Sequence, residues 1–306
     1  MILRSATFLV IGLTAAWGLA LHPAPAQDTT EEGKGPTLAQ FEDARALAVD
    51  PRGQLYVADA ARDVVALLRP NGTRRAVIGG GSTQAGSFNE PSDVDPTNGQ
   101  VLLVADTYNG RVQRFSGEGR YLETLSIGPD DQTDSESWVF SDRQSGFAVQ
   151  GAGRPVAVVS SSDGAIFVID ARGGVLRKWT EFGRLQRIAG GNRRGASQLK
   201  DPVALALGSE RRLYVADAGQ GRVLVYDRYG TFIRRLRTPP LPKVRALTMH
   251  QGRLWIVCAD RLVIWTRAQR QVTERSIDLE KPLVDAAPQP SALYLLTRTR
   301  LTRRSR

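Results

Sequence analysis

Four aspartates recur at the end of one repeated phrase, and they are the acidic residues most readily taken for catalytic groups. They are Asp59, Asp106, Asp170 and Asp217. A catalytic acid is usually a single residue, whereas a residue that returns with every repeat serves the repeat itself. We therefore expect these carboxylates to accept hydrogen bonds from turn amides. We also expect ion pairs with an arginine five residues on, Asp106 with Arg111 and Asp217 with Arg222.

Histidine is too scarce for the common histidine-based sites. The chain has two, His22 and His250, and His22 lies in an apolar leader. A zinc site with two or three histidines is therefore not expected, and no nucleophile motif accompanies His250. Gly79 to Gly81 lack the lysine and the helix of a phosphate-binding loop. The single cysteine, Cys258, lies inside a repeat, and we expect it to pack as a small hydrophobe.

Two landmarks, fifteen residues apart, occur six times along the chain. The later one closes phrases such as Leu55-Tyr-Val-Ala-Asp59, and successive copies lie 47, 64, 47, 41 and 39 residues apart. A period near forty with short apolar runs is typical of a propeller blade with about four strands. We therefore predict an all-β, six-bladed β-propeller.

The domain boundaries follow from the same landmarks. We expect a signal peptide at residues 1–26, a polar linker at 27–36, the propeller at 37–301 and a basic tail at 302–306. The blades are expected to start near Ala44, Pro91, Pro155, Pro202, Lys243 and Pro282. Because the sixth copy ends near Leu301, the last blade should borrow a strand from residues 36–42.

The repeated pattern resembles the NHL repeat. The pattern is Pro-x-x-Val/Leu-Ala, then Leu-Tyr-Val-Ala-Asp, then Arg-Val-x-x-Phe/Tyr, and residues 106–115 and 217–226 match it best. The glycine-rich stretches 79–91 and 190–202 resemble the connections between blades in that family. The resemblance covers roughly residues 40–300 and implies a six-bladed β-propeller. The third, fifth and sixth copies depart from the pattern.

A calcium site is the alternative to a protein without a cofactor. Some six-bladed propeller enzymes, the lactonases and phosphotriesterase-like enzymes, hold calcium at the axis with carboxylate and amide oxygens. Asn89, Glu90, Asp93 and Asp201 lie near blade entrances and would be the ligands here. The matching positions in other blades do not supply a metal set, so we expect no cofactor and keep calcium as the alternative.

The leader predicts the compartment of the protein, and the charge distribution predicts its type of partner. Residues 1–26 combine Arg4, an apolar run and the small-residue motif Ala24-Pro-Ala26, which predicts export to the periplasm or outside the cell, with cleavage or retention of the leader left open. No transmembrane span is expected in the mature chain.

Residues 231–306 hold 16 Lys and Arg against 5 Asp and Glu. This field favours an acidic glycan, an anionic lipid head group or an envelope protein, and nucleic acid is not expected for an exported protein.

The loops on one face of the disc are the expected binding surface, because they vary while the strands repeat. The residues expected there are Arg62, Tyr108, Asn109, Arg172, Arg193, Arg194 and Gln220. We predict a non-enzymatic binding or scaffold protein of the cell envelope, with a calcium-dependent hydrolase of the lactonase or esterase type as the alternative. The role of the acidic and apolar insertion at 129–146, the ligand and the oligomeric state stay open.

Overall fold

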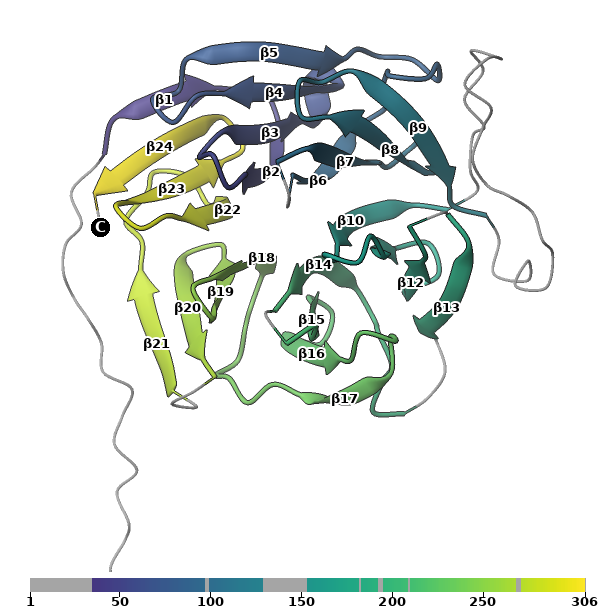
Figure 1. Ribbon diagram of the computed structural model, residues 1–306. Coiled ribbons are helices and arrows are strands. Elements are labelled where there is room, and N and C mark those ends of the chain that lie inside the picture. Colours follow the sequence, from purple (N-terminus) through teal and green to yellow (C-terminus); the bar gives the residue numbers. More distant parts are fainter. Residues whose placement is uncertain are drawn as a thin grey trace, which may run out of the picture.

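The chain forms six four-stranded antiparallel sheets arranged around a common centre (Figure 1). The computed structural model describes residues 35–96, 99–128, 153–181, 183–191, 195–208, 210–267 and 271–305. Within these residues the only helical segment is a short 3-10 turn, η1 (Ala60–Arg62). The predicted all-β, six-bladed propeller is therefore confirmed.

Each blade runs from an innermost to an outermost strand, and the observed starts lie within one residue of those predicted. Blade 1 is β2 (Ala44–Val49), β3 (Leu55–Asp59), β4 (Val64–Leu68) and β5 (Arg74–Gly79). Blade 2 is β6 (Pro91–Asp95), β7 (Val101–Asp106), β8 (Arg111–Ser116) and β9 (Tyr121–Ser126). Blade 3 is β10 (Pro155–Ser160), β11 (Ile166–Asp170), β12 (Val175–Trp179) and β13 (Leu185–Gly190). Blade 4 is β14 (Pro202–Leu207), β15 (Leu213–Asp217), β16 (Arg222–Tyr226) and β17 (Phe232–Arg235). Blade 5 is β18 (Val244–His250), β19 (Arg253–Cys258), β20 (Arg261–Thr266) and β21 (Gln271–Ser276). Blade 6 is β22 (Leu283–Pro288), β23 (Ala292–Thr297), β24 (Arg300–Ser305) and β1 (Thr37–Gln40).

The core lies between neighbouring blades. The repeated phrase forms the second strand of its blade, and all five residues of β3 and of β15 are buried. Their side chains alternate between the two adjoining blades, which explains why the phrase is apolar on both faces. Tyr56 of blade 1, for example, shares a core cluster with Phe88 and Phe115 at the entrance to and within blade 2.

The ring closes by pairing the two ends of the described chain. Strand β1 is antiparallel to β24, with Ala39 opposite Leu301 and Gln40 opposite Arg300. The expected loan of a strand from residues 36–42 is thus observed. The expected basic tail at 302–306 is corrected, because residues 302–305 continue β24 and Arg304 is 4% exposed.

Two smaller expectations concern buried groups and membranes. Cys258 is fully buried, and desolvation raises the pKa of its thiol to about 11. It therefore packs as a small hydrophobe, as expected. Among the described residues no helix has the length and apolar character needed to cross a bilayer.

Candidate functional site

One face of the disc collects the loops that enter each blade. In the first four blades the innermost strand begins opposite the aspartate that ends the second strand, as Ala44 does with Asp59 and Pro91 with Asp106. The hairpins after these aspartates therefore share a face with the connections between blades. We call it the hairpin face.

The four repeated aspartates hold these connections in place. Asp59 accepts hydrogen bonds from the backbone N–H groups of Glu42 and Asp43 at 3.1 and 2.9 Å. The other three accept from the equivalent residues ahead of their own innermost strands, Asn89, Arg154, Lys200 and Asp201, at 2.8 to 3.1 Å. The aspartates are at most 2% exposed. Their carboxylates satisfy amides that no strand pairs, which is a structural role.

The cation beside each aspartate differs between blades. In blade 2 the Arg111 Nε lies 2.6 Å from the Asp106 Oδ2, and both side chains are fully buried. Desolvation raises the pKa of Asp106, although Arg111 opposes that rise. In blade 3 the partner of Asp170 is Arg177, whose Nη2 lies at 2.9 Å.

Blade 4 does not form the pair expected from its sequence. Asp217 accepts from the side-chain amide of Gln220 at 2.7 Å, and that amide also donates to the Gln198 carbonyl at 2.7 Å. Arg222 pairs with Asp217 only through the β15–β16 ladder, and its exposed side chain makes no hydrogen bond or ion pair with the residues that the structure describes. Gln220 lies three residues after its aspartate, as Asn109 does in blade 2, and makes the equivalent side-chain hydrogen bonds.

The residues expected on the binding face fall into three groups. Arg62, Tyr108 and Arg172 are exposed on it, and Arg62 pairs with Glu42 at 2.8 Å. Asn109 is corrected, because it is fully buried and its amide donates to Asp106 and to the Ser82 carbonyl. Gln220 is likewise committed to Asp217. Arg193, Arg194 and the 129–146 insertion lie outside the described residues.

An exposed aromatic–cation pair crosses the junction of blades 2 and 3. Tyr108 is 50% exposed, and the Arg154 guanidinium lies 5.4 Å from its ring centroid. An Arg154 nitrogen also lies 3.5 Å from the tyrosine hydroxyl. Tyr108 lies in the hairpin between β7 and β8, and Arg154 directly precedes β10. The sequence analysis selected Tyr108 as a binding residue but not Arg154, whose position ahead of the expected blade start holds an acid in blades 1, 2 and 4, a proline in blade 5 and a lysine in blade 6.

Cations surround the starts of the innermost strands. Arg45 pairs with Asp43 at 2.6 Å and lies 3.7 Å from Glu90. Lys243 and Arg245 are exposed at the entrance to blade 5 and have no acidic partner in the described part of the chain. Lys243 and Arg245 therefore give the entrance to blade 5 a positive charge.

Two aspartates face the axis below this rim. Asp93 and Asp285 occupy the same register position on β6 and β22, opposite Ala105 and Leu296. Each accepts the N–H of the next residue on its own strand and an N–H of the neighbouring blade, from Val158 for Asp93 and from Leu47 for Asp285, at 2.7 to 2.8 Å. An innermost strand has a free inner edge, so its amides need such acceptors.

These axial carboxylates are proton acceptors of unusual strength. Desolvation raises the pKa of Asp285 to about 7 and the pKa of Asp93 well above its ordinary value. The charge of Asp285 adds to the rise at Asp93. Asp285 was not among the residues singled out from the sequence, although aligning the six inner strands places it level with Asp93.

The residues expected to hold calcium do not form a ligand set. Glu90 faces Arg45, and Asp93 uses both carboxylate oxygens on backbone amides. Asn89 and Asp201 are exposed at the entrances to blades 2 and 4. Within the described ranges no three His, Cys, Asp or Glu side chains are grouped so that they could hold a metal ion.

Comparison with known proteins bears on the fold. No family model matches the chain. The Drosophila melanogaster protein brain tumor is 26% identical over 150 residues, which is 49% of this chain but 12% of that protein. A gluconolactonase from Xanthomonas campestris has a TM-score of 0.62 at 16% identity, covering 93% of this chain and 99% of that one. A chain in a nidogen–laminin complex has a TM-score of 0.58 at 14% identity, covering 77% and 81%.

These similarities establish the architecture of the chain but not its function. At such identities, related propellers include an enzyme and a member of a protein complex, because the fold supports many functions. The NHL resemblance stays a prediction. The chain is a six-bladed β-propeller like these structures.

Proposed function

We propose that the chain is a non-enzymatic binding protein that holds an anionic partner on its hairpin face and works, after export, in the cell envelope. The observation that carries the proposal is the exposed Tyr108–Arg154 stack across the junction of blades 2 and 3. Tyrosine and arginine are the residue types enriched at the energetic centres of interfaces.

The surroundings of this pair support an anionic partner. Arg172, Lys243 and Arg245 are exposed on the same face and add positive potential around it. Lys243 and Arg245 have no acidic partner among the described residues, so their charge can act on a ligand. The expected signal peptide at 1–26 supports export, and it makes an envelope protein, an acidic glycan or an anionic lipid head group the candidate partner.

The chain offers a matched control for testing this surface. Tyr229 is 55% exposed and stacks with Arg228 at 4.7 Å, in the turn between β16 and β17. That turn follows the third strand of its blade and so lies on the opposite face of the disc. The two faces thus carry similar tyrosine–arginine pairs in different surroundings.

The experiment places a photo-crosslinking amino acid at position 108 or at position 229 in intact cells. We expect a discrete crosslinked product from position 108, weakened by Arg154→Ala and by raised salt. Position 229 should yield no such product. Equal products from both positions, or none from position 108, would reject the hairpin face as the binding surface. The identity of the product separates protein, glycan and lipid.

A calcium-dependent hydrolase of the lactonase or esterase type is the second candidate. The likeness to a gluconolactonase structure and the two axial carboxylates favour it. The four residues expected to be ligands do not fit calcium in their observed positions, so no reaction step is assigned to a metal. Metal analysis of the purified protein, with melting curves with and without chelator, tests this candidate. Stoichiometric calcium and a chelator-induced fall in Tm would favour it over the binding protein.

A further inference from the structure

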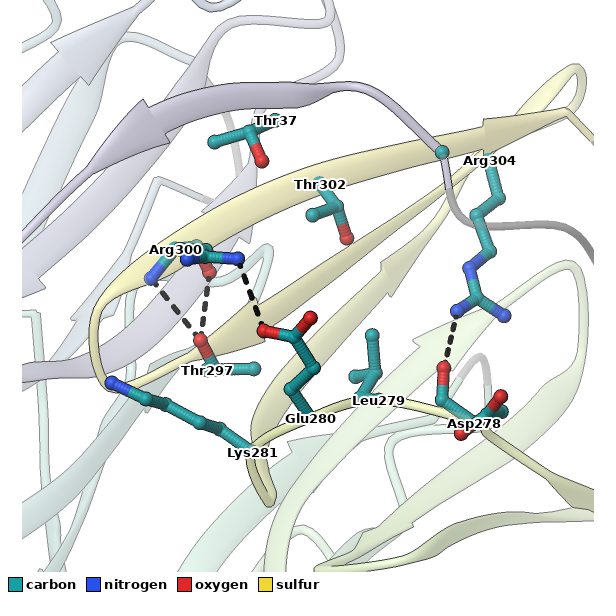
Figure 2. A pocket seen from close by; sticks show the side chains of 10 residues that line it. Thr37, Asp278, Leu279, Glu280, Lys281, Thr297, Arg300, Thr302 and Arg304 are labelled. Carbon is teal, nitrogen blue, oxygen red and sulfur yellow. Dashed lines mark hydrogen bonds and ion pairs between the residues drawn. The ribbon is translucent and has the colours of Figure 1, made fainter.

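A pocket of about 230 Å³ lies in blade 6, away from the centre of the hairpin face (Figure 2). It is bounded by β24 on one side and by the connection from β21 to β22 on the other. Its lining residues include Thr37, Leu279, Lys281, Arg300, Thr302 and Arg304. Figure 2 shows the Arg304 side chain reaching down from β24 toward Asp278.

Arg304 occupies a position that is apolar in every other blade. It lies opposite Leu293 on the second strand, and the residues in this register in blades 1 to 5 also lie opposite a leucine or isoleucine. They are Leu68, Phe115, Trp179, Tyr226 and Trp265, all at most 4% exposed. Arg304 is buried to the same degree, at 4% exposure. In blade 6 a cationic side chain, Arg304, therefore occupies a core position.

The buried guanidinium has donors to spare. One Nη donates to the Asp278 carbonyl at 2.9 Å, while the Nε has no acceptor. No carboxylate pairs with Arg304 among the described residues. A buried charge with unused donors is costly unless something else binds it. The backbone at Gly35 packs closely beside this arginine, since a Cβ there would lie 2.0 Å from the Arg303 carbonyl oxygen and 3.1 Å from the Arg304 Cγ.

The pocket exists because the connection into blade 6 is short. The connection into blade 2 spans residues 80–90, and its Phe88 packs edge-on against Phe115 at 5.5 Å. Arg111 of blade 2 donates to three carbonyls of that connection. The connection into blade 6 spans only residues 277–282 and leaves the equivalent space open.

A second arginine, Arg300, lies at the rim of the pocket, while Arg304 lies at its floor. Arg300 stands at the start of β24, as Arg111 stands at the start of β8. Its Nη1 lies 3.5 Å from Glu280, and both side chains are at least half exposed, so this ion pair is weak. Figure 2 shows the hydroxyls of Thr37 and Thr302 on the same side of β1 and β24 as the pocket.

We propose that this pocket binds a small organic oxyanion, a carboxylate or a phosphate ester. Arg304 donates to the anionic group from the floor, Arg300 and Lys281 add charge at the rim, and Leu279 contacts the apolar part of the ligand. A guanidinium suits this task because its planar fork binds two oxygens of one carboxylate or phosphate. This site lies in blade 6, apart from the Tyr108–Arg154 pair, and does not depend on the partner proposed for that pair.

The test compares melting of the whole mature protein in phosphate, acetate and hexanoate with melting in chloride at equal ionic strength, followed by calorimetric titration. We expect a saturable rise in Tm of about 5–10 °C at roughly a hundredfold excess over Kd. Arg304→Leu copies blade 1, so it should fold with an unchanged or higher Tm and lose the anion-dependent rise. Arg253→Gln removes an exposed charge of blade 5 and should keep it.

The outcomes separate a built site from general anion effects. An equal rise in wild type and Arg304→Leu, or no saturable rise with any of the three anions, would overturn the proposal. Tighter binding of hexanoate than of acetate identifies a carboxylate with an apolar body, and a preference for phosphate identifies the ester. If Arg304→Leu does not fold, Arg300→Gln must weaken binding severalfold while Arg253→Gln leaves it unchanged.

Discussion

Arg111 and Arg222 share one sequence pattern and should differ sharply in their effect on stability. Each follows its aspartate by five residues and precedes a valine. Arg111 is fully buried, pairs with Asp106 and donates to three backbone carbonyls of the connection between blades 1 and 2. The Arg222 side chain is exposed and makes no hydrogen bond or ion pair with the described residues. We compare the substitutions Arg111→Met and Arg222→Met.

The expected change in the free energy of unfolding depends on which groups each substitution leaves unpaired. Arg111→Met strands the Asp106 carboxylate in a fully desolvated site and leaves carbonyls unpaired, which lowers the free energy of unfolding by about 3–5 kcal/mol. For a domain of this size that corresponds to a fall in Tm of roughly 6–20 °C. Arg222→Met removes a solvated side chain and should change stability by less than about 0.5 kcal/mol.

Urea denaturation followed by tryptophan fluorescence, with calorimetric melting as a second probe, measures both variants. The double variant Asp106→Asn, Arg111→Met removes the stranded charge and should recover part of the loss. Equal destabilisation at positions 111 and 222 would refute the reasoning, since it would mean that the sequence pattern and not the burial sets the energy. A double variant no better than Arg111→Met would show that the lost carbonyl bonds dominate.

Three further predictions concern protons, closure and the thiol. Because the pKa of Asp285 is raised to about 7 in the fold, the native state binds the extra proton, so stability falls as pH rises and roughly 2–3 kcal/mol is lost between pH 5 and 8; Asp285→Asn should flatten the pH dependence of Tm, and parallel profiles would contradict the assignment. Truncation after residue 290 removes β23 and β24, to which β1 pairs, and should abolish the cooperative melting transition, whereas a sharp transition at the parent temperature would show that closure is dispensable. The buried Cys258 thiol, with its pKa raised to about 11, should react with a thiol reagent only after unfolding, and rapid labelling of the native protein would place it at the surface.

The structural meaning of the repeated aspartates was predictable from their recurrence, but their partners were not. A residue that returns every blade must serve the blade, and the structure shows all four binding amides ahead of the innermost strands. The side chain that joins each aspartate differs between the blades. Blade 2 uses Arg111, blade 3 uses Arg177 and blade 4 uses Gln220.

The binding face was predictable in outline and less so in detail. Strand alternation placed the hairpins and connections together, as observed. It could not show that Asn109 turns inward, because an asparagine in a hairpin suits solvent and a buried carboxylate equally well. Nor could it find the stack of Tyr108 on Arg154, since the two residues are 46 positions apart and meet only across a blade junction.

The sequence by itself determined the architecture, because a propeller is built from local units. Five of the six blades pair only strands that are adjacent in the chain, and the sixth adds β1, so period, turn residues and apolar runs are enough to predict six sheets and their order. The tertiary structure decided the environment of each charged side chain. Arg304 reads as part of a basic tail, yet the pairing of β24 with β1 buries it at a core position. Whether a charged side chain meets water, a carboxylate or a pocket depends on segments far away in sequence, and desolvation then sets its energy.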